Sequence, residues 1–136
     1  MSITDKIIAD IKELHRLGGW DKDHLVNSAR EIASLLRARD DATKTQLRKF
    51  LHVMRKLEAD FQKDHFEKAP VILLKPKFAY TVARKEDLAP LGLVLEAAIG
   101  KVEDDKDFEA LLDFMESVVA YNEYLPIEKR LQERRG

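Results

Sequence analysis

Apolar residues recur three or four positions apart along nearly the whole chain, and this spacing is what most restricts the fold. Over residues 4–17 it places Ile7, Ile8, Ile11 and Leu14 on one side of a helix that stops at Gly18-Gly19. Later segments repeat the pattern, and no alternating apolar and polar run is long enough for a strand. The chain is therefore predicted to be all-α, a bundle of about five or six helices.

Capping residues and prolines divide this pattern into helices. The predicted helices cover 4–17 with Thr4 as N-cap, from Asp21 or Asp23 to Arg39, from Thr43 to about His65, from Pro70 with a bend near Lys75 caused by Pro76, from Asp87 to Gly100, and from Asp107 to Pro126. Trp20 is expected to fill the gap between the first two helices. Residues 127–136 carry both charges and form either a short amphiphilic helix or a frayed tail.

The segment after Asp87 is apolar on nearly every side, which is typical of a central, buried helix. Its apolar residues are Leu88, Leu91, Leu93, Val94, Leu95, Ala98 and Ile99. A chain of 136 residues has the size of one domain, so residues 1–136 are expected to share one core.

Composition excludes several classes of protein. No apolar run approaches the roughly 18 residues of a membrane helix, and residues 1–6 lack the apolar part of a secretory signal. The absence of cysteine excludes disulfides, thiolate metal sites and cysteine nucleophiles. We therefore expect a cytoplasmic protein without membrane contact.

The net charge of -1 conceals a strong segregation of charge along the chain. Residues 42–57 and 68–85 contain no acidic residue and together carry +10, so the other 102 residues carry -11. Within the first window Lys44, Arg48 and Arg55 fall within about 40° of one another on a helix, and Lys49 extends this arc. Such segregation predicts a one-sided field and an oriented partner.

The second window continues the basic face. If Lys77 lies on a helix, then Thr81, Arg84 and Lys85 lie on the same side, while Phe78 turns toward the core. Lysine and arginine at such positions neutralise phosphates without reading bases. The simplest alternative is a solvated cationic face of no particular function.

Catalytic constellations are not found in the sequence. The four histidines lack the i, i+4 spacing of a helical zinc site, and the five glycines form no phosphate-binding loop. The carboxylates at Asp104, Asp105 and Asp107 are explained by an acidic link that caps the next helix. We therefore expect no enzyme activity, no metal and no cofactor.

Three sequence blocks resemble a known family, the small subunit of the type III-A CRISPR effector, known as the Csm complex. The blocks are Thr45-Gln46-Leu47-Arg48-Lys49-Phe50, then Leu74-Lys75-Pro76-Lys77-Phe78-Ala79-Tyr80 followed by Arg84, and Val118-Val119-Ala120-Tyr121. They come in the family's order and spacing across residues 43–124. The second block is the most specific, because Lys-Pro-Lys-x-Ala-Tyr is an unusual string.

This resemblance implies a non-catalytic, all-helical protein whose copies stack as a filament along paired CRISPR RNA and target RNA, within a complex of other Csm subunits. It implies that Leu47, Phe50 and Tyr80 are packing residues. The basic stripes and the resemblance together predict RNA-binding side chains at Lys44, Arg48, Lys49, Arg55, Lys75, Lys77, Arg84 and Lys85.

Other functions remain open from the sequence. A helical adaptor that binds only protein would leave the basic stripes unused, and a small nucleotide-processing enzyme would need a carboxylate or histidine cluster. A sequence-specific DNA-binding domain would need a tight turn before a base-reading helix, which residues 65–69 do not resemble. If copies associate, the segregated charge predicts weak, salt-sensitive contacts between them.

Overall fold

Helices occupy most of the chain in the computed structural model, which describes residues 2–36 and 40–135. The elements are α1 (Ile3–Glu13), the 3-10 turn η1 (Leu17–Gly19), α2 (Lys22–Leu35), α3 (Asp41–Lys63), α4 (Lys68–Ile72), α5 (Leu74–Arg84), the 3-10 turn η2 (Glu86–Leu88), α6 (Ala89–Ile99) and α7 (Asp105–Arg135). No strand occurs in the described residues. The prediction of an all-α fold is confirmed.

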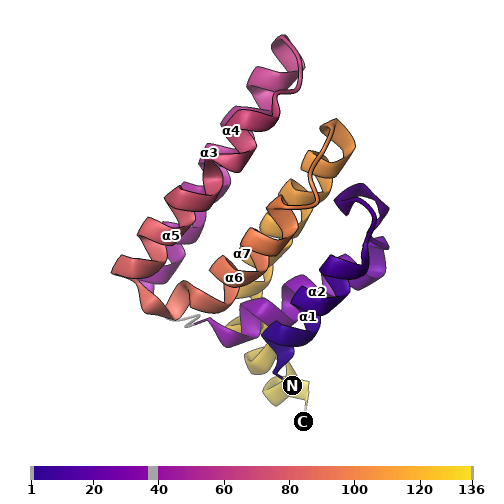
Figure 1. The fold of residues 1–136 in the computed structure, drawn as a ribbon. Coiled ribbons are helices and arrows are strands. Elements are labelled where there is room, and N and C mark those ends of the chain that lie inside the picture. Colours follow the sequence, from indigo (N-terminus) through magenta and orange to yellow (C-terminus); the bar gives the residue numbers. More distant parts are fainter. Residues whose placement is uncertain (1, 37–39, 136) are drawn as a thin grey trace.

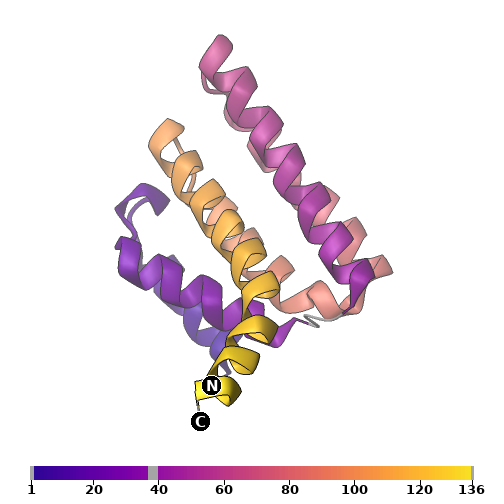
Figure 2. The same cartoon turned by 180° about the vertical axis from the view of Figure 1, so that it is seen from behind.

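The helices form a central pair with a group of helices on either side (Figures 1 and 2). The central pair is α6 and α7, with α1 and α2 on one side and the arm formed by α3, α4 and α5 on the other. In this arrangement α6 contacts α1 and α5, while α7 contacts α2 and α3. The arm therefore joins the rest of the protein through both central helices.

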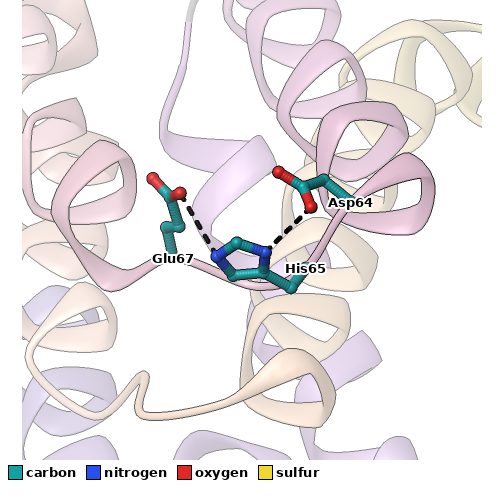
Figure 3. Close-up of side chains that lie close together, drawn as sticks. All are labelled: Asp64, His65 and Glu67. Atoms are coloured by element: carbon teal, nitrogen blue, oxygen red, sulfur yellow. Dashed lines mark hydrogen bonds and ion pairs between the residues drawn. The ribbon is translucent and has the colours of Figure 1, made fainter.

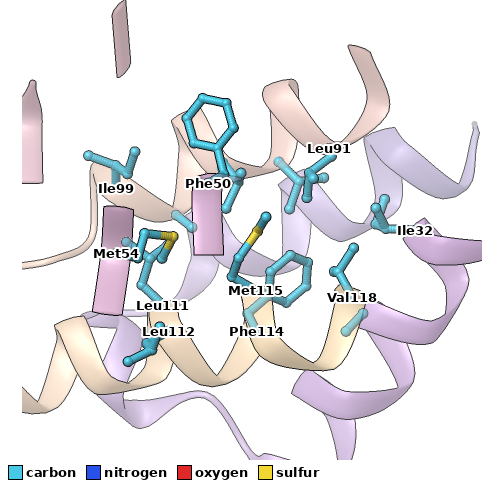
Figure 4. Close-up of a cluster of buried hydrophobic side chains, with 14 of the residues drawn as sticks. Ile32, Phe50, Met54, Leu91, Ile99, Leu111, Leu112, Phe114, Met115 and Val118 are labelled. Carbon is cyan, nitrogen blue, oxygen red and sulfur yellow. The ribbon is translucent and has the colours of Figure 1, made fainter. Parts of the chain in front are cut away.

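The core lies where α6 and α7 face the outer pairs (Figure 4). Leu95 and Phe114 are completely buried. Trp20 is buried, as expected for a packing residue, but its ring stacks on Phe114 of α7 with 5.4 Å between ring centroids. The prediction that α6 is buried on all sides is wrong at Leu93, which is 54% exposed. That residue lines a groove between α6 and α5.

Three helix starts differ from the predicted ones, and at α1 and α3 a neighbouring polar residue provides the cap. The N–H of Asp5 donates to Ser2 Oγ at 3.1 Å, so Ser2 rather than Thr4 caps α1. Asp40 rather than Thr43 caps α3, and Thr43 is buried inside the helix. At α6 the N-cap is Leu88, not the predicted Asp87.

Some helix ends also differ from the predicted ones. α1 ends at Glu13, before the predicted Leu17, because Leu14 is extended. α2 ends at Leu35, and the predicted end at Arg39 lies outside the described residues. The predicted stop at Gly100 is confirmed, since this residue caps α6.

The two internal prolines behave differently. The predicted bend near Lys75 is found at Leu73, where α4 ends, so Pro76 lies in the first turn of α5 and requires no N–H partner there. By contrast, the prediction that Pro126 ends the last helix is wrong, because α7 continues to Arg135. An ion pair between Glu128 and Arg30 joins the part of α7 beyond the proline to α2.

The start of α7 is tied to the first link by a buried carboxylate. Asp104, not Asp107 as predicted, caps this helix, since the N–H of Asp107 donates to Asp104 Oδ1 at 2.9 Å. The buried Asp107 carboxylate instead accepts from the backbone N–H of Gly18 at 2.8 Å, from the backbone N–H of Glu103 at 2.8 Å, and from Arg16 Nε at 3.0 Å. A Cβ at Gly18 would lie 2.8 Å from Asp107 Oδ1, so this close approach requires glycine.

None of the helices within residues 2–36 and 40–135 combines the length and the apolar character of a membrane-crossing helix.

Candidate nucleic-acid interface

The two acid-free windows of the sequence lie side by side on α3 and α5 (Figures 1 and 2). Phe50 of α3 and Phe78 of α5 stack with 3.5 Å between ring centroids and 14° between ring planes. Both rings are at least nine-tenths buried. This aromatic contact fixes the spacing of the two helices, and the basic residues beside it form one surface.

A groove, here called the α3/α5 groove, follows this contact on the outer side of the arm. Its volume is about 460 Å³, and it is lined by Gln46, Lys49, Phe50, Val53, Pro76, Lys77, Tyr80 and Thr81. A second hollow, here called the outer hollow, adjoins it and is lined by Ala42, Gln46, Lys49, Tyr80, Thr81, Arg84 and Lys85. No carboxylate lines either of them, so the local charge is positive.

Four of the eight predicted RNA-binding residues line the groove or the hollow. Lys49, Lys77 and Arg84 are exposed and take part in no ion pair among the described residues. Lys85 differs, because its Nζ lies 2.7 Å from Asp40 Oδ2 and also contacts Asp87. These hydrogen bonds raise the pKa of Lys85 above its ordinary value, the bond to Asp40 being the larger cause.

The other four predicted residues lie elsewhere. Arg48 donates from Nε to Glu123 Oε1 at 3.0 Å, and Arg55 lies 3.6 Å from Glu116, so both face α7. Both arginine side chains remain more than half exposed, as expected for a surface pair. The last two are Lys44, which is half-buried, and Lys75, which faces α6 instead of α3.

Tyr80 belongs to this surface, although the family resemblance predicts a packing role for it. Leu47 and Phe50 are buried, as predicted for packing residues, but Tyr80 is 65% exposed and the packing prediction is wrong for it. Its ring stands next to Lys77 and Arg84 on the helix surface, three and four positions away. That spacing was a usable signal, since residues at i, i+3 and i+4 share one face of a helix.

A small polar cluster lies at the turn between α3 and α4 (Figure 3). His65 Nδ1 lies 3.0 Å from Asp64 Oδ1, and His65 Nε2 lies 3.4 Å from Glu67 Oε1. The imidazole therefore stands between the two carboxylates and turns one nitrogen to each. This geometry suits a protonated histidine, and the hydrogen bond to Asp64 raises the pKa of His65. One ligand atom of each residue lies within 4.8 Å of the others, but all three residues are exposed, and exposed acidic groups commonly gather in this way without a metal.

A comparison with known protein families gives a match whose range contains all three sequence blocks. A sequence model described as Csm2 Type III-A matches residues 20–126, a range that includes both walls of the α3/α5 groove. No curated protein and no solved structure matches the chain.

Proposed function

Because the chain belongs to the Csm2 Type III-A family, the small subunits of the type III-A Csm complex, we propose that it is a non-catalytic subunit that binds the backbone of CRISPR RNA and target RNA. One observation carries this proposal. Lys49, Lys77 and Arg84 gather from two helices onto one surface where no carboxylate competes for them. Unpaired cations on a rigid surface suit phosphate, because binding releases counterions from the nucleic acid.

The remaining predicted residues extend this surface around α3. Arg48 and Arg55 are held by glutamates of α7, but exposed pairs of this kind contribute only about 0–1 kcal/mol, so a phosphate can replace the carboxylate. With Lys44, Lys75 and Lys85, we assign them to the edges of the RNA path.

Charge reversal tests the proposal. The double variant Arg48→Glu/Arg84→Glu should lose RNA binding while its helical content stays unchanged, as measured by fluorescence anisotropy and circular dichroism. In the wild type, log affinity should fall with log salt at a slope of about 0.7 to 0.9 per neutralised phosphate. A second variant, Lys49→Glu/Arg84→Glu, breaks no ion pair of the described chain and should behave the same.

The matched control reverses Lys12 and Lys129, two exposed lysines on α1 and α7, and should retain binding. Undiminished binding of single-stranded and duplex RNA by both test variants, or a wild-type slope near zero, would contradict the proposal. Binding should not require magnesium, because no metal-dependent step is assigned to this subunit. RNA cleavage that appears only with magnesium would refute the non-catalytic role.

We also propose that copies of the subunit contact one another along the RNA. A head-to-tail contact needs two different patches on one molecule. The chain exposes an apolar groove between α5 and α6 that includes Leu93, and Ile127 and Leu131 are exposed on the last turns of α7. Sedimentation at high concentration and low salt should show weak association that Leu131→Glu removes. A strict monomer that RNA recruits as single copies would refute this contact.

The α5/α6 groove is also the observation that favours the second candidate, an adaptor that binds only protein. The adaptor hypothesis predicts that the protein binds its partner without RNA and that the charge reversals do not change this binding. The same RNA titrations therefore separate the two functions.

A further inference from the structure

The α3/α5 groove has an apolar floor that phosphate binding alone does not require. Phe50 and Val53 of α3 and Pro76 of α5 supply this floor. Phe50 is held in place by its stack on Phe78, so the floor does not depend on a mobile side chain. Its volume of about 460 Å³ lies within the range of about 300 to 1,000 Å³ that is usual for sites of small organic groups.

An exposed aromatic ring stands at the wall of this groove. Tyr80 is 65% exposed, which is unusual for a large aromatic ring, and it therefore contributes little to the core. Arg84 orients it, since Arg84 Nη1 donates to Tyr80 Oη at 3.2 Å and the guanidinium carbon lies 5.7 Å from the ring centroid. The ring is therefore a positioned, flat surface next to a cation.

The outer hollow supplies the polar half of the site. It shares Gln46, Lys49, Tyr80 and Thr81 with the groove, so an occupant of one lies next to an occupant of the other. Arg84 lines the hollow but not the groove, and neither contains a carboxylate. The combined site suits a flat apolar body that carries a negative charge beside it.

A nucleotide has this composition, and an apolar peptide segment does not. We propose that the α3/α5 groove holds one unstacked base of the bound RNA against Tyr80, while the phosphate beside that base lies in the outer hollow near Lys49 and Arg84. This inference rests on the proposed RNA binding and adds to it a contact with a base. Stacking on tyrosine tolerates any base, because each base has a π-face.

The test compares two probes with the full 136-residue chain: a short oligouridylate and an abasic ribose-phosphate strand of the same length. Because stacking of a base on an aromatic side chain is substantial, the wild type should prefer the oligouridylate by about 5- to 100-fold. Tyr80→Leu should reduce that preference to about twofold or less without changing the salt slope, whereas Tyr80→Phe should keep it. A fully paired duplex, whose bases are stacked, should bind the wild type and Tyr80→Leu alike.

The matched control is Tyr124→Leu, which removes an exposed tyrosine from α7 and should leave the preference unchanged. If Tyr80→Leu folds poorly, 4-thiouridine crosslinking to the wild type decides, and the crosslink should map to α3 or α5 around the groove. Equal wild-type affinity for both strands, or a crosslink elsewhere, overturns the base site and leaves phosphate binding intact. Binding of neither strand would overturn both this inference and the proposed function.

Discussion

Replacing Asp107 by asparagine should destabilise the protein strongly, although the two side chains have nearly the same size. The carboxylate is 2% exposed and accepts three hydrogen bonds, from Gly18, Glu103 and Arg16. Asparagine keeps one acceptor oxygen and turns an NH₂ group toward a backbone N–H. At least one charge-assisted bond is lost and one buried donor loses its partner, so the free energy of unfolding should fall by about 2 to 4 kcal/mol.

The dependence on pH gives this prediction a second test. Burial alone would raise the pKa of Asp107, but the hydrogen bonds from Glu103 and Gly18 and the charge of Arg16 outweigh burial and lower it from 3.8. A lowered folded-state pKa gives a stabilisation that is complete above the ordinary pKa and is lost as pH falls through the lowered one. The difference between wild type and Asp107→Asn should therefore shrink on acidification below about pH 4.

Urea unfolding followed by circular dichroism, near neutral pH and at about pH 3, measures both quantities. The control is Asp113→Asn, an exposed carboxylate on the same helix that pairs with Lys22 and should change stability by less than about 1 kcal/mol. A loss at Asp107→Asn as small as that of the control would refute the reasoning. So would a loss that stays constant with pH, because it would then not depend on the carboxylate charge.

Other predictions concern the surface and the core. Glu123→Gln should release Arg48 and tighten RNA binding by about 1.5- to 5-fold, measured by anisotropy, and a weaker affinity would contradict the role assigned to Arg48. Leu95→Ala should lower the free energy of unfolding by about 2 to 5 kcal/mol in urea titrations, whereas Leu93→Ala, at an exposed position of the same helix, should lower it far less. NMR titration should find His65 still protonated above its ordinary pKa of 6.5, and Asp64→Asn should lower that pKa; no change on this substitution would exclude the ion pair as its cause.

Helical periodicity was sufficient to predict the fold class, because the spacing of apolar residues is a property of each helix alone. The same local information placed Trp20 in the core and the bend before Pro76. Pro126 was misjudged because a helical proline is a local signal, while the contact of Glu128 with Arg30, which joins the helix beyond the proline to α2, links residues 98 positions apart. Capping residues were misassigned by a few positions, since several polar residues compete at each helix start.

The sequence was sufficient to predict which segments carry the basic residues of the candidate interface. It could not show which of these residues pair with α7 and which line the groove. A helical wheel groups Arg48 with Lys49, yet it cannot show that α7 lies along one side of this arc and supplies Glu123 there. The groove itself arises from two helices that the sequence does not show to be neighbours. The packing role of Tyr80 came from the family resemblance alone, whereas in the structure its ring is exposed beside the α3/α5 groove.

The packing of α2 on the last helix also affects how the protein is made. α2 packs mainly on α7, and the Asp107 carboxylate joins the turn at Gly18 to a residue 89 positions later. At a synthesis rate of about 5 to 20 residues per second, α2 leaves the ribosome roughly 4 to 20 s before the helix that covers it. During that interval the apolar stripe of α2 lacks its main partner within the nascent chain, so this interval is when the subunit most needs a chaperone or rapid completion.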